Sequence, residues 1–323
     1  MALHWLFARR LAPWLYLAPL LAMVLLFWLT PIGLTVYLSL TNVSYKNLVY
    51  FIRGEMERIS FTLRNLQNVF LGKDPFIASV AEVTLIYVCS VLAINAFYSL
   101  VLSIAIAFFV RSEALSTFLR VTWLLPRITP SVVYGLMWLW LIAPGTGPLY
   151  SLLAHVGIHP ASWLLDKPYS QLLMIAINGY VGVSFGMIIY TAAIKSIPTD
   201  LINAARVDGA SDFFIARRII LPLLKWPMLF VVSWQTLSLI ASYEYILIVW
   251  GGGAPGTESV GTAWAAGVMV FPLYAWFQAF ALGNYAYGAA IALPIVLLGI
   301  GLILLYFKVF GFQKLMQPAR IEV

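Results

Sequence analysis

The sequence predicts an all-α polytopic membrane protein with about six transmembrane helices. Of its 323 residues, 63% are hydrophobic and only 10% are charged, whereas soluble domains average about 45–50% apolar and ~25% charged residues. The apolar residues are gathered in segments long enough to cross the ~30 Å hydrocarbon core of a bilayer, which takes about 20 helical residues. Together, the composition and the segment lengths exclude a soluble fold.

Six apolar segments are expected to cross the membrane. The first lies behind Arg9 and Arg10. It is longer than the ~7–15 residues of a signal-peptide core and no small-x-small cleavage site follows it, so we interpret it as an uncleaved span. Pro126 and Pro130 are expected to distort the beginning of the third span, because proline removes a backbone donor. The expected spans are residues 11–40, 79–110, 118–142, 169–194, 228–250 and 278–307.

The polar segments divide the chain into four parts. Residues 41–78 are mixed in charge and contain the amphipathic stretch NLQNVFLGKDPF, which we expect along the outer membrane surface. Loops rich in glycine and proline follow the third and fifth spans, and residues 262–277 are expected to dip into the membrane edge without crossing. The expected parts are an N-terminal cytosolic tip and first span (1–40), an extracytoplasmic loop (41–78), a core transmembrane domain (79–310) and a cytosolic tail (311–323).

The positions of the basic residues predict the orientation. With six spans and both ends inside, most of the 19 Lys and Arg residues fall on the cytosolic side, as the positive-inside rule requires. The exceptions lie mainly in the first outer loop, where acidic residues partly offset them. We therefore expect a multi-pass protein of the cytoplasmic membrane, surrounded by lipid, with both termini in the cytosol. The basic residues expected in the cytosol are Arg9, Arg10, Arg111, Arg120, Arg127, Lys195, Arg206, Arg217, Arg218, Lys225, Lys308, Lys314 and Arg320.

Composition also limits the chemistry that the chain can carry. Basic residues beside the spans explain the net charge of +7 better than a basic face interleaved with aromatics, so no nucleic-acid partner is expected. The single cysteine, Cys89, excludes an intrachain disulfide and is interpreted as a small buried hydrophobic residue. His155 and His159 have the i,i+4 spacing of zinc ligands, but no carboxylate or third histidine lies near them, and no metal site is expected.

No catalytic or nucleotide-binding motif is found. The sequence lacks G-x4-G-K-[ST], H-E-x-x-H and G-x-S-x-G. Its glycine-rich stretches GTGP and GGGAPG lack the lysine and the following helix that a phosphate site needs. We therefore expect that the chain is not an enzyme, binds no cofactor itself and depends on another chain for any energy it uses.

A long polar interval separates two apolar blocks in the second half of the chain. It is PTDLINAARVDGASDFFIARRIILPLLKWP, residues 198–227. Thr199 or Asp200 can cap a first short helix, because a side-chain oxygen there accepts from free backbone N–H groups. The Asp-Gly pair that follows ends this helix, since glycine tolerates positive φ, and Ser211 or Asp212 can cap a second one. These residues are predicted to form a helix-turn-helix elbow, which we call the elbow.

The spacing within the elbow resembles the EAA loop of permease subunits from binding-protein-dependent ABC importers. The fuller family motif is EAA-x2-DGA-x8-I-x-LP-x4-P, and Pro227 fits its last position. The chain departs from it in two places: Asn203 replaces the glutamate, and Ala216 stands where an aromatic residue is usual. The resemblance implies contact with an ATPase for Asn203, Ala204, Ala205, Asp208, Gly209, Ala210, Ile219, Leu221 and Pro222.

Further stretches are similar to the carbohydrate-importer, maltose-permease-like branch of this family. They include NLQNVF, WLLPRITPSVVYGLMWLW and FALGNYAYGAAIA, and the resemblance runs over residues 14–310. It implies the type I ABC importer permease fold and a heterodimer with a second permease subunit. It also implies two cytosolic ABC ATPases that each grip one elbow and carry ATP and Mg, and an extracytoplasmic sugar-binding protein. Closure of the ATPases around ATP would turn the permease pair outward-facing, and hydrolysis would reverse this.

Polar and aromatic residues of the fourth and fifth spans are the candidates for contact with a sugar, which is bound by hydrogen bonds and by aromatic rings. The pattern N-x3-G-x2-F places three of them on one helix face, and similar maltose-type permeases use such a set for the sugar. The glycine could instead serve tight helix packing, and the phenylalanine could face lipid. The candidates are Asn178, Gly182, Phe185, Gln235, Thr236, Leu239, Ile240 and Tyr243.

Other functions fit the sequence less well. An ion-coupled secondary transporter would bury carboxylates or histidines in several spans, yet only Glu82 and Glu244 are near a span, and we expect Glu244 at the outer interface. A membrane enzyme would need a convergent acid, base or metal set. A glycerol phosphodiester carried by the same importer architecture would favour cations in the cavity, and the fourth and fifth spans contain none. The expected cargo is a disaccharide or oligosaccharide such as trehalose or maltose.

Overall fold

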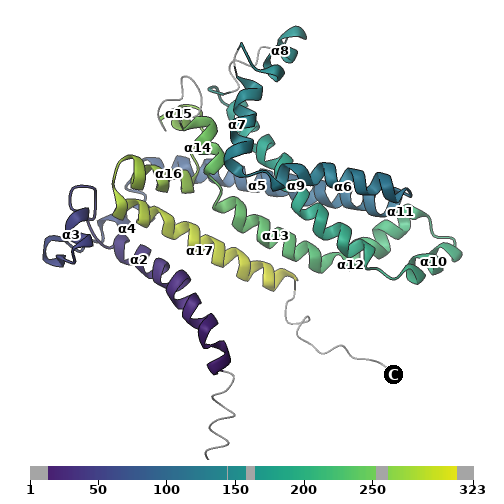
Figure 1. Cartoon of the computed structure of the whole chain (residues 1–323), viewed down its shortest axis with the longest axis horizontal. Helices are drawn as coiled ribbons and strands as arrows, with labels where there is room; N and C mark the ends of the chain where they lie inside the picture. The colour runs from purple at the N-terminus through teal and green to yellow at the C-terminus, as the bar shows by residue number, and fades with distance from the viewer. Residues whose placement is uncertain (1–13, 144, 158–163, 252–260, 311–323) are drawn as a thin grey trace, which may run out of the picture. The chain divides into compact units, whose positions relative to one another are not determined.

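The described part of the protein is almost entirely helical (Figure 1). A computed structural model describes residues 14–143, 145–157, 164–251 and 261–310. Within those ranges, the β pairing is limited to an isolated antiparallel bridge between Thr41 and Phe61. The prediction of an all-α fold is therefore confirmed.

Four helical segments in these ranges are long and apolar enough to cross a membrane. They are Trp14–Ser39, Phe76–Phe109, Tyr169–Lys195 and Tyr285–Val309. The second and third of them coincide closely with the spans expected at residues 79–110 and 169–194. A fifth is added if the bent helix pair described next forms one span, so the expected number of about six is not reached by continuous helices alone.

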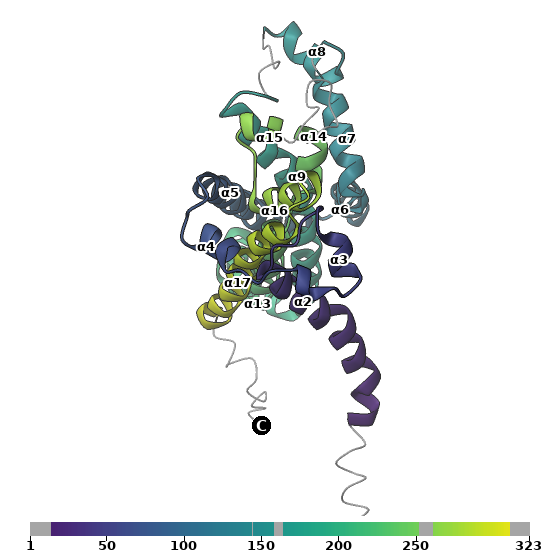
Figure 2. The ribbon, with the colours of Figure 1, turned by 90° about the vertical axis from the view of Figure 1, so that its left-hand side faces the viewer.

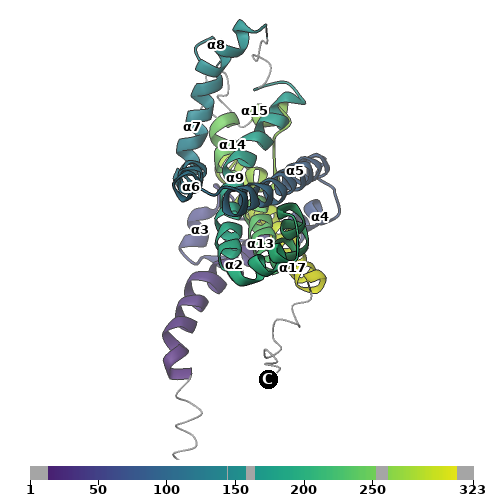
Figure 3. The same cartoon turned by 90° about the vertical axis from the view of Figure 1, so that its right-hand side faces the viewer.

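The third expected span, residues 118–142, is not one helix. It consists of α6 (Glu113–Ile128) and α7 (Ser131–Ile142), which are bent by 98° relative to each other. Thr129, with φ −76° and ψ 127°, is extended, because the residue before a proline is driven out of the helical region. The sequence indicated a distortion here but placed it at the beginning of the span, whereas the chain turns sharply in the middle (Figure 3).

The fifth and sixth expected spans are also interrupted. The fifth, residues 228–250, consists of α13 (Lys225–Ile240) and α14 (Glu244–Trp250), separated by three residues outside the helices. The sixth was expected from residue 278, but its long helix, α17, covers Tyr285–Phe310. A π-helical turn precedes it, and Gly283 has φ +68°, a conformation that ends a helix and that glycine adopts readily. Two short helices, α15 (Gly261–Ala265) and α16 (Phe271–Trp276), lie where a dip into the membrane edge was expected.

The described chain forms two compact units. The first contains the residues up to Pro75 together with Ala275–Pro294, including α2 (Thr30–Ser39), α3 (Leu48–Ile52) and α4 (Arg64–Phe70). Its core is a cluster of Val43, Ile59 and Ala286. The N–H of Ala286 donates to the carbonyl of Val43 at 2.9 Å, so the expected outer loop folds onto the beginning of α17.

The second unit contains Phe76–Tyr274 and the residues from Ile295 onward. Its centre is the pairing of α5 (Phe76–Ile104) with α9 (Tyr169–Lys195), and α6 and α13 pack beside them (Figure 1). The two backbones approach closely because α9 presents glycines. A Cβ atom on Gly182 would lie 2.0 Å from Nδ2 of Asn95, and one on Gly186 would lie 2.3 Å from Oγ of Ser99. Small residues thus build this interface, as in many membrane helix pairs.

The elbow forms much as the sequence predicted. It comprises α10 (Thr199–Val207), α11 (Asp212–Ile215), a π-helical turn (Ala216–Ile220) and α12 (Leu221–Leu223). The turn after α10 has Gly209 at φ +84°, and Oγ of Ser211 caps α11 by accepting from the N–H of Phe214. The cap expected at Thr199 or Asp200 is wrong: α10 starts after Pro198 and has no side-chain cap.

Candidate functional site

A cavity of about 460 Å³ lies within the second unit. Its size falls in the ~300–1,000 Å³ range of small-molecule sites. The break between α6 and α7, the break between α13 and α14, and the middle of α9 surround it. The lining residues are Arg127, Ile128, Thr129, Pro130, Ser131, Tyr134, Asn178, Val181, Gly182, Gln235, Ser238, Leu239, Ala241, Ser242, Tyr243, Glu244 and Tyr245.

The two helix breaks explain why the cavity is polar. A helix that ends leaves backbone groups without intrahelical partners, and non-helical backbone at membrane depth is tolerated where it lines a cavity or is covered by protein. The two helices that follow the breaks also pack against each other. Helix α7 packs against α14 at Gly135, where a Cβ atom would lie 3.3 Å from the side chain of Ile248 (Figure 2).

The cavity brings together five of the eight residues expected to contact a sugar: Asn178, Gly182, Gln235, Leu239 and Tyr243. On α13, Gln235 and Leu239 are four residues apart and share one face.

The other three candidates lie outside the cavity lining. Thr236 and Ile240 occupy the next face of α13 and are buried, and Oγ1 of Thr236 lies 2.9 Å from the hydroxyl of Tyr306. Phe185 stacks on Trp234, with ring centroids 6.0 Å apart. The structure therefore places these three side chains away from the cavity surface.

Two amide side chains in the lining are held in fixed orientations by hydrogen bonds. Nδ2 of Asn178 donates to the hydroxyl of Tyr87 at 2.8 Å, and that hydroxyl donates to Oγ of Ser242 at 3.3 Å. Gln235 donates to the carbonyl of Gly182 at 3.0 Å. Preorganised polar groups of this kind fix the orientation of a bound ligand.

The cavity also contains two charged residues that the sequence did not place there. Arg127 was expected near the cytosol and Glu244 at the outer interface, yet both line this one cavity. The guanidinium of Arg127 lies 5.4 Å from the centroid of the Phe185 ring, and Glu244 accepts a hydrogen bond from the hydroxyl of Ser131. The signal for Arg127 was its position shortly before Pro130, where α6 ends.

The elbow lies at the far end of α9 from α14 (Figure 1). Its inner side is a cluster of buried residues that includes Ile215, Ile220 and Leu224, and this cluster packs against Phe108, in the π-helical turn that follows α5. Apolar packing therefore holds the elbow rigidly on the helix ends.

The residues expected to contact an ATPase divide into two groups. Ala205, Ala210 and Ile219 pack against the buried cluster, and Leu221 is half-buried. The exposed members are Asn203, Ala204, Asp208, Gly209 and Pro222. The exposed group is the part of the elbow that a partner can reach.

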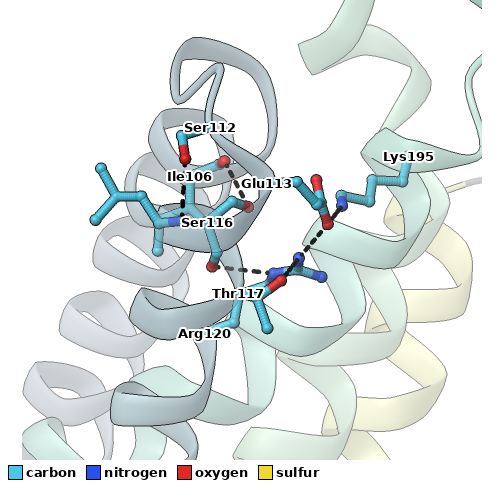
Figure 4. Close-up of polar contacts among 8 residues, drawn as sticks. Ile106, Ser112, Glu113, Ser116, Thr117, Arg120 and Lys195 are labelled. Atoms are coloured by element: carbon cyan, nitrogen blue, oxygen red, sulfur yellow. Dashed lines mark hydrogen bonds and ion pairs between the residues drawn. The ribbon is translucent and has the colours of Figure 1, made fainter.

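An ion-pair cluster joins the start of α6 to the end of α9 (Figure 4). Oε1 of Glu113 accepts from Arg120 at 2.8 Å and from Nζ of Lys195 at 2.7 Å. The hydroxyl of Ser116 donates to the carbonyl of Ile106 at 3.2 Å. Lys195 is the last residue of α9, so the cluster lies immediately before the elbow.

Among the described residues there is no group of three His, Cys, Asp or Glu side chains that could hold a metal ion. His155 contacts the carbonyl of Ser151 at 2.6 Å, and His159 lies outside the described residues. Cys89 is exposed on α5 and not buried as expected, because it faces away from the contact with α9.

These features define a multi-pass helical membrane protein with a polar cavity among its helices and a helical elbow at one end. Residues 99–321 match the family described as "Binding-protein-dependent transport system inner membrane component". This match covers more than half of the chain, and the chain belongs to this family of transport permease subunits. The family resemblance found in the sequence is thereby confirmed.

Curated relatives extend the comparison to nearly the full length. The chain is 26% identical to the trehalose/maltose transport system permease protein MalF of Thermococcus litoralis, over 93% of this chain and 94% of the relative. It is 30% identical to the xylose/arabinose import permease protein XacH of Haloferax volcanii, over 72% of this chain and 69% of the relative. For two further curated relatives, the matched part of this chain spans only 61% and 50% of the relative's own length.

A solved structure supports the fold. The crystal structure of a bacterial ABC transporter involved in the import of the acidic polysaccharide alginate contains a chain that superposes with a TM-score of 0.76. The alignment covers 97% of this chain and 99% of that chain, at 17% identity. The expected permease fold is confirmed by this similarity.

Proposed function

We propose that this chain is the transmembrane subunit of an ATP-driven importer that carries a neutral sugar across the cytoplasmic membrane. The observation that supports this most directly is the cavity, whose lining combines amide and hydroxyl groups with the rings of Tyr134, Tyr243 and Tyr245. Sugars present hydroxyls to such groups and apolar faces to such rings. The volume of about 460 Å³ suits a disaccharide or a short part of an oligosaccharide.

Two of the relatives carry cargo of the same class. The two named above are a trehalose/maltose permease and a xylose/arabinose permease. We expect the cargo to be a disaccharide or oligosaccharide such as trehalose or maltose, bound by Asn178, Gln235 and Tyr243. In this proposal Phe185, Thr236 and Ile240 support the cavity from behind its lining.

The elbow is proposed as the site of coupling to a cytosolic ATPase. Its exposed residues, Asn203, Ala204, Asp208, Gly209 and Pro222, would contact the ATPase, and its buried side would pass the movement to α5 and α9. ATP and Mg would be bound by the ATPase subunits. This is consistent with a sequence that has no phosphate-binding motif.

The complete importer would contain four further chains. We propose a second permease subunit, two ABC ATPases and an extracytoplasmic sugar-binding protein, with both termini of this chain in the cytosol. Closure of the ATPases around ATP would draw the elbows together and open the cavity to the outside, and hydrolysis would reverse the movement. The chain would divide into an N-terminal tip with the first span (1–40), an outer loop (41–78), a transmembrane core (79–310) and a tail (311–323).

A glycerol phosphodiester is a second candidate cargo, and one observation favours it. Arg127 brings a cation to the cavity lining, and within the described residues it forms no ion pair. A guanidinium is well suited to phosphate oxygens. However, Glu244 brings a carboxylate to the same lining, so the formal charges of these two residues cancel. A neutral sugar is therefore preferred to a phosphodiester as the proposed cargo. One carboxylate is weak support for the ion-coupled alternative.

The proposal is tested by purifying the chain with its second permease and ATPase subunits and reconstituting the complex in proteoliposomes. ATPase activity and uptake are measured with the binding protein loaded with maltose, trehalose, xylose or glycerophosphocholine. Stimulation by one of the sugars supports the proposal and identifies the cargo. Stimulation by glycerophosphocholine alone favours the second candidate. A chain that purifies without any ATPase contradicts the importer assignment.

A further inference from the structure

We infer that Asn95, on α5, is a positioning residue that holds the carboxamide of Gln235 in the orientation needed to bind cargo. Asn95 does not line the cavity, and no sequence pattern indicated a role for it. The inference rests on the proposed function, because it assigns Asn95 to the same sugar site. The observation behind it is a hydrogen-bond network that connects α5 to α13 and α13 to α9.

The network consists of two hydrogen bonds between buried groups. Nδ2 of Asn95 donates to Oε1 of Gln235 at 2.7 Å, and Nε2 of Gln235 donates to the carbonyl of Gly182 at 3.0 Å. Asn95 is 0% exposed and Gln235 is 5% exposed. In such a shielded setting hydrogen bonds are electrostatically stronger than in water.

The donor and acceptor types allow only one arrangement of these groups. The carbonyl of Gly182 can only accept, so it requires the NH2 group of Gln235 on its side. The oxygen of Gln235 therefore faces α5, and Asn95 must present its own NH2 group to it. Without a donor at position 95, the oxygen of Gln235 would lose its partner and the carboxamide could rotate.

Packing alone does not account for an asparagine at this position. The side chain occupies the space beside Gly182, where a Cβ atom would lie 2.0 Å from Nδ2 of Asn95. Its Oδ1 atom accepts no hydrogen bond from any described residue, although it is buried. A buried carboxamide with an unpaired oxygen destabilises a helix interface, and an apolar side chain of similar volume would avoid that cost.

The arrangement leaves Gln235 with a donor and an acceptor for the cavity. One hydrogen of its NH2 group is used by Gly182 and one lone pair of its oxygen by Asn95, so one N–H and one lone pair stay free. These two groups are adjacent, as are the neighbouring hydroxyls of a sugar ring. A fixed Gln235 can thus bind one hydroxyl as donor and the next as acceptor.

The experiment compares Asn95→Leu with Ser99→Ala in the reconstituted complex, using the sugar of the panel that the wild type takes up fastest. Leu is similar in size to Asn but has no donor, so Oε1 of Gln235 loses its partner in a buried setting. Ser99 lies one turn further on α5 beside Gly186. Its hydroxyl donates to the backbone carbonyl of Asn95 and has no described hydrogen bond to the side chain of Asn95 or Gln235, which makes it a matched control for the buried α5–α9 interface.

For Asn95→Leu we expect KM for uptake to rise about tenfold, which corresponds to ~1.4 kcal/mol of binding free energy, while the maximal rate changes less than about twofold. Ser99→Ala should leave both parameters close to those of the wild type. A loss of maximal rate with unchanged KM, or equal effects of the two variants, would overturn the inference.

A second measurement does not depend on cargo. The thermal unfolding midpoints of Asn95→Ala, Gln235→Ala and the double variant are compared in detergent. We expect the double variant to lose clearly less than the sum of the single losses, because each single variant already breaks the shared hydrogen bond. Additive losses would refute the hydrogen bond between Asn95 and Gln235, even if the wild type transports a sugar. A wild type that transports no sugar would refute the proposed function, but it would not affect the result on this hydrogen bond.

Discussion

Lys195, the last residue of α9, donates to Oε1 of Glu113, the first residue of α6, at 2.7 Å. Both helices continue to the cavity, where α6 contributes Arg127 and α9 contributes Asn178. The same carboxylate oxygen also accepts from Arg120. The ion pair therefore joins two helices that connect the elbow end of the unit to the proposed sugar site.

Glu113→Gln should weaken coupling between ATP hydrolysis and uptake. The variant loses the charge that holds α6 to α9, so the elbow can move without carrying α6 with it. We expect the number of sugar molecules taken up per ATP hydrolysed to fall several-fold, with KM for the sugar unchanged. Because the pair is exposed, little change in thermal stability is expected.

Two variants serve as controls for this prediction. Glu55→Gln removes a similar exposed ion pair, with Arg58, and should leave coupling intact. Exchanging the charges, with Glu113→Lys and Lys195→Glu together, should restore much of the coupling. Normal coupling in Glu113→Gln would show that the pair has no part in transmission.

Gly209→Ala should impair transport while Gly54→Ala should not. The two glycines have similar positive φ angles, +84° and +74°, and both have open space around them. An L-residue at either site costs about 1–2 kcal/mol of backbone strain. Only Gly209 lies in the elbow, so only its variant should alter the shape that the ATPase contacts.

Gly209→Pro carries this prediction further, because proline fixes φ near −65° and cannot adopt the angle of this turn. We expect membrane insertion at the wild-type level, measured in membrane fractions, and no uptake. Uptake by Gly209→Pro at the wild-type rate would contradict the coupling role of the elbow.

Long helices were easier to predict from this sequence than their interruptions. The helix ending at Lys195 and the one ending at Phe109 follow from apolar length and flanking charge alone. The bend after Ile128 had a local signal in Pro130, but its angle of 98° depends on the packing of α7 against α14. The break at residues 241–243 contains neither Gly nor Pro, so local sequence could not reveal it.

The same interruptions limited prediction of the site. Helical spacing placed Gln235 and Leu239 correctly on one face, but it could not decide which face of α13 lines the cavity, and Thr236 and Ile240 were included with them. Arg127 and Glu244 were assigned to opposite sides of the membrane because both helices were treated as continuous. Asn95 gave no signal, since its role depends on a contact between helices 140 residues apart in sequence.

Arg127→Gln and Glu244→Gln should shift selectivity in opposite directions. Removing the cation leaves a net negative lining, which should weaken inhibition of sugar uptake by glycerol 3-phosphate, which is an anion. Removing the carboxylate, while keeping a hydrogen bond to Ser131, should strengthen inhibition by anionic analogues several-fold. The measurement is competition against labelled sugar in proteoliposomes, and Lys225→Gln, which removes a cation outside the cavity lining, is the control. Identical selectivity in all three variants would show that the two charges do not face the cargo.

Gly182→Ala should destabilise the protein, whereas Gly33→Ala should stabilise it slightly. The new Cβ atom at position 182 would lie 2.0 Å from Nδ2 of Asn95, but at position 33 it meets nothing within 4 Å. Overpacking costs about 1–3 kcal/mol of unfolding free energy, and replacing glycine by alanine inside an open helix gains about 0.5–1 kcal/mol. Unfolding midpoints in detergent measure both effects. Combining Gly182→Ala with Asn95→Ala removes the clashing side chain and should recover most of the loss. If it recovers none, the destabilisation has another origin and the close approach of α5 and α9 at these two residues is contradicted.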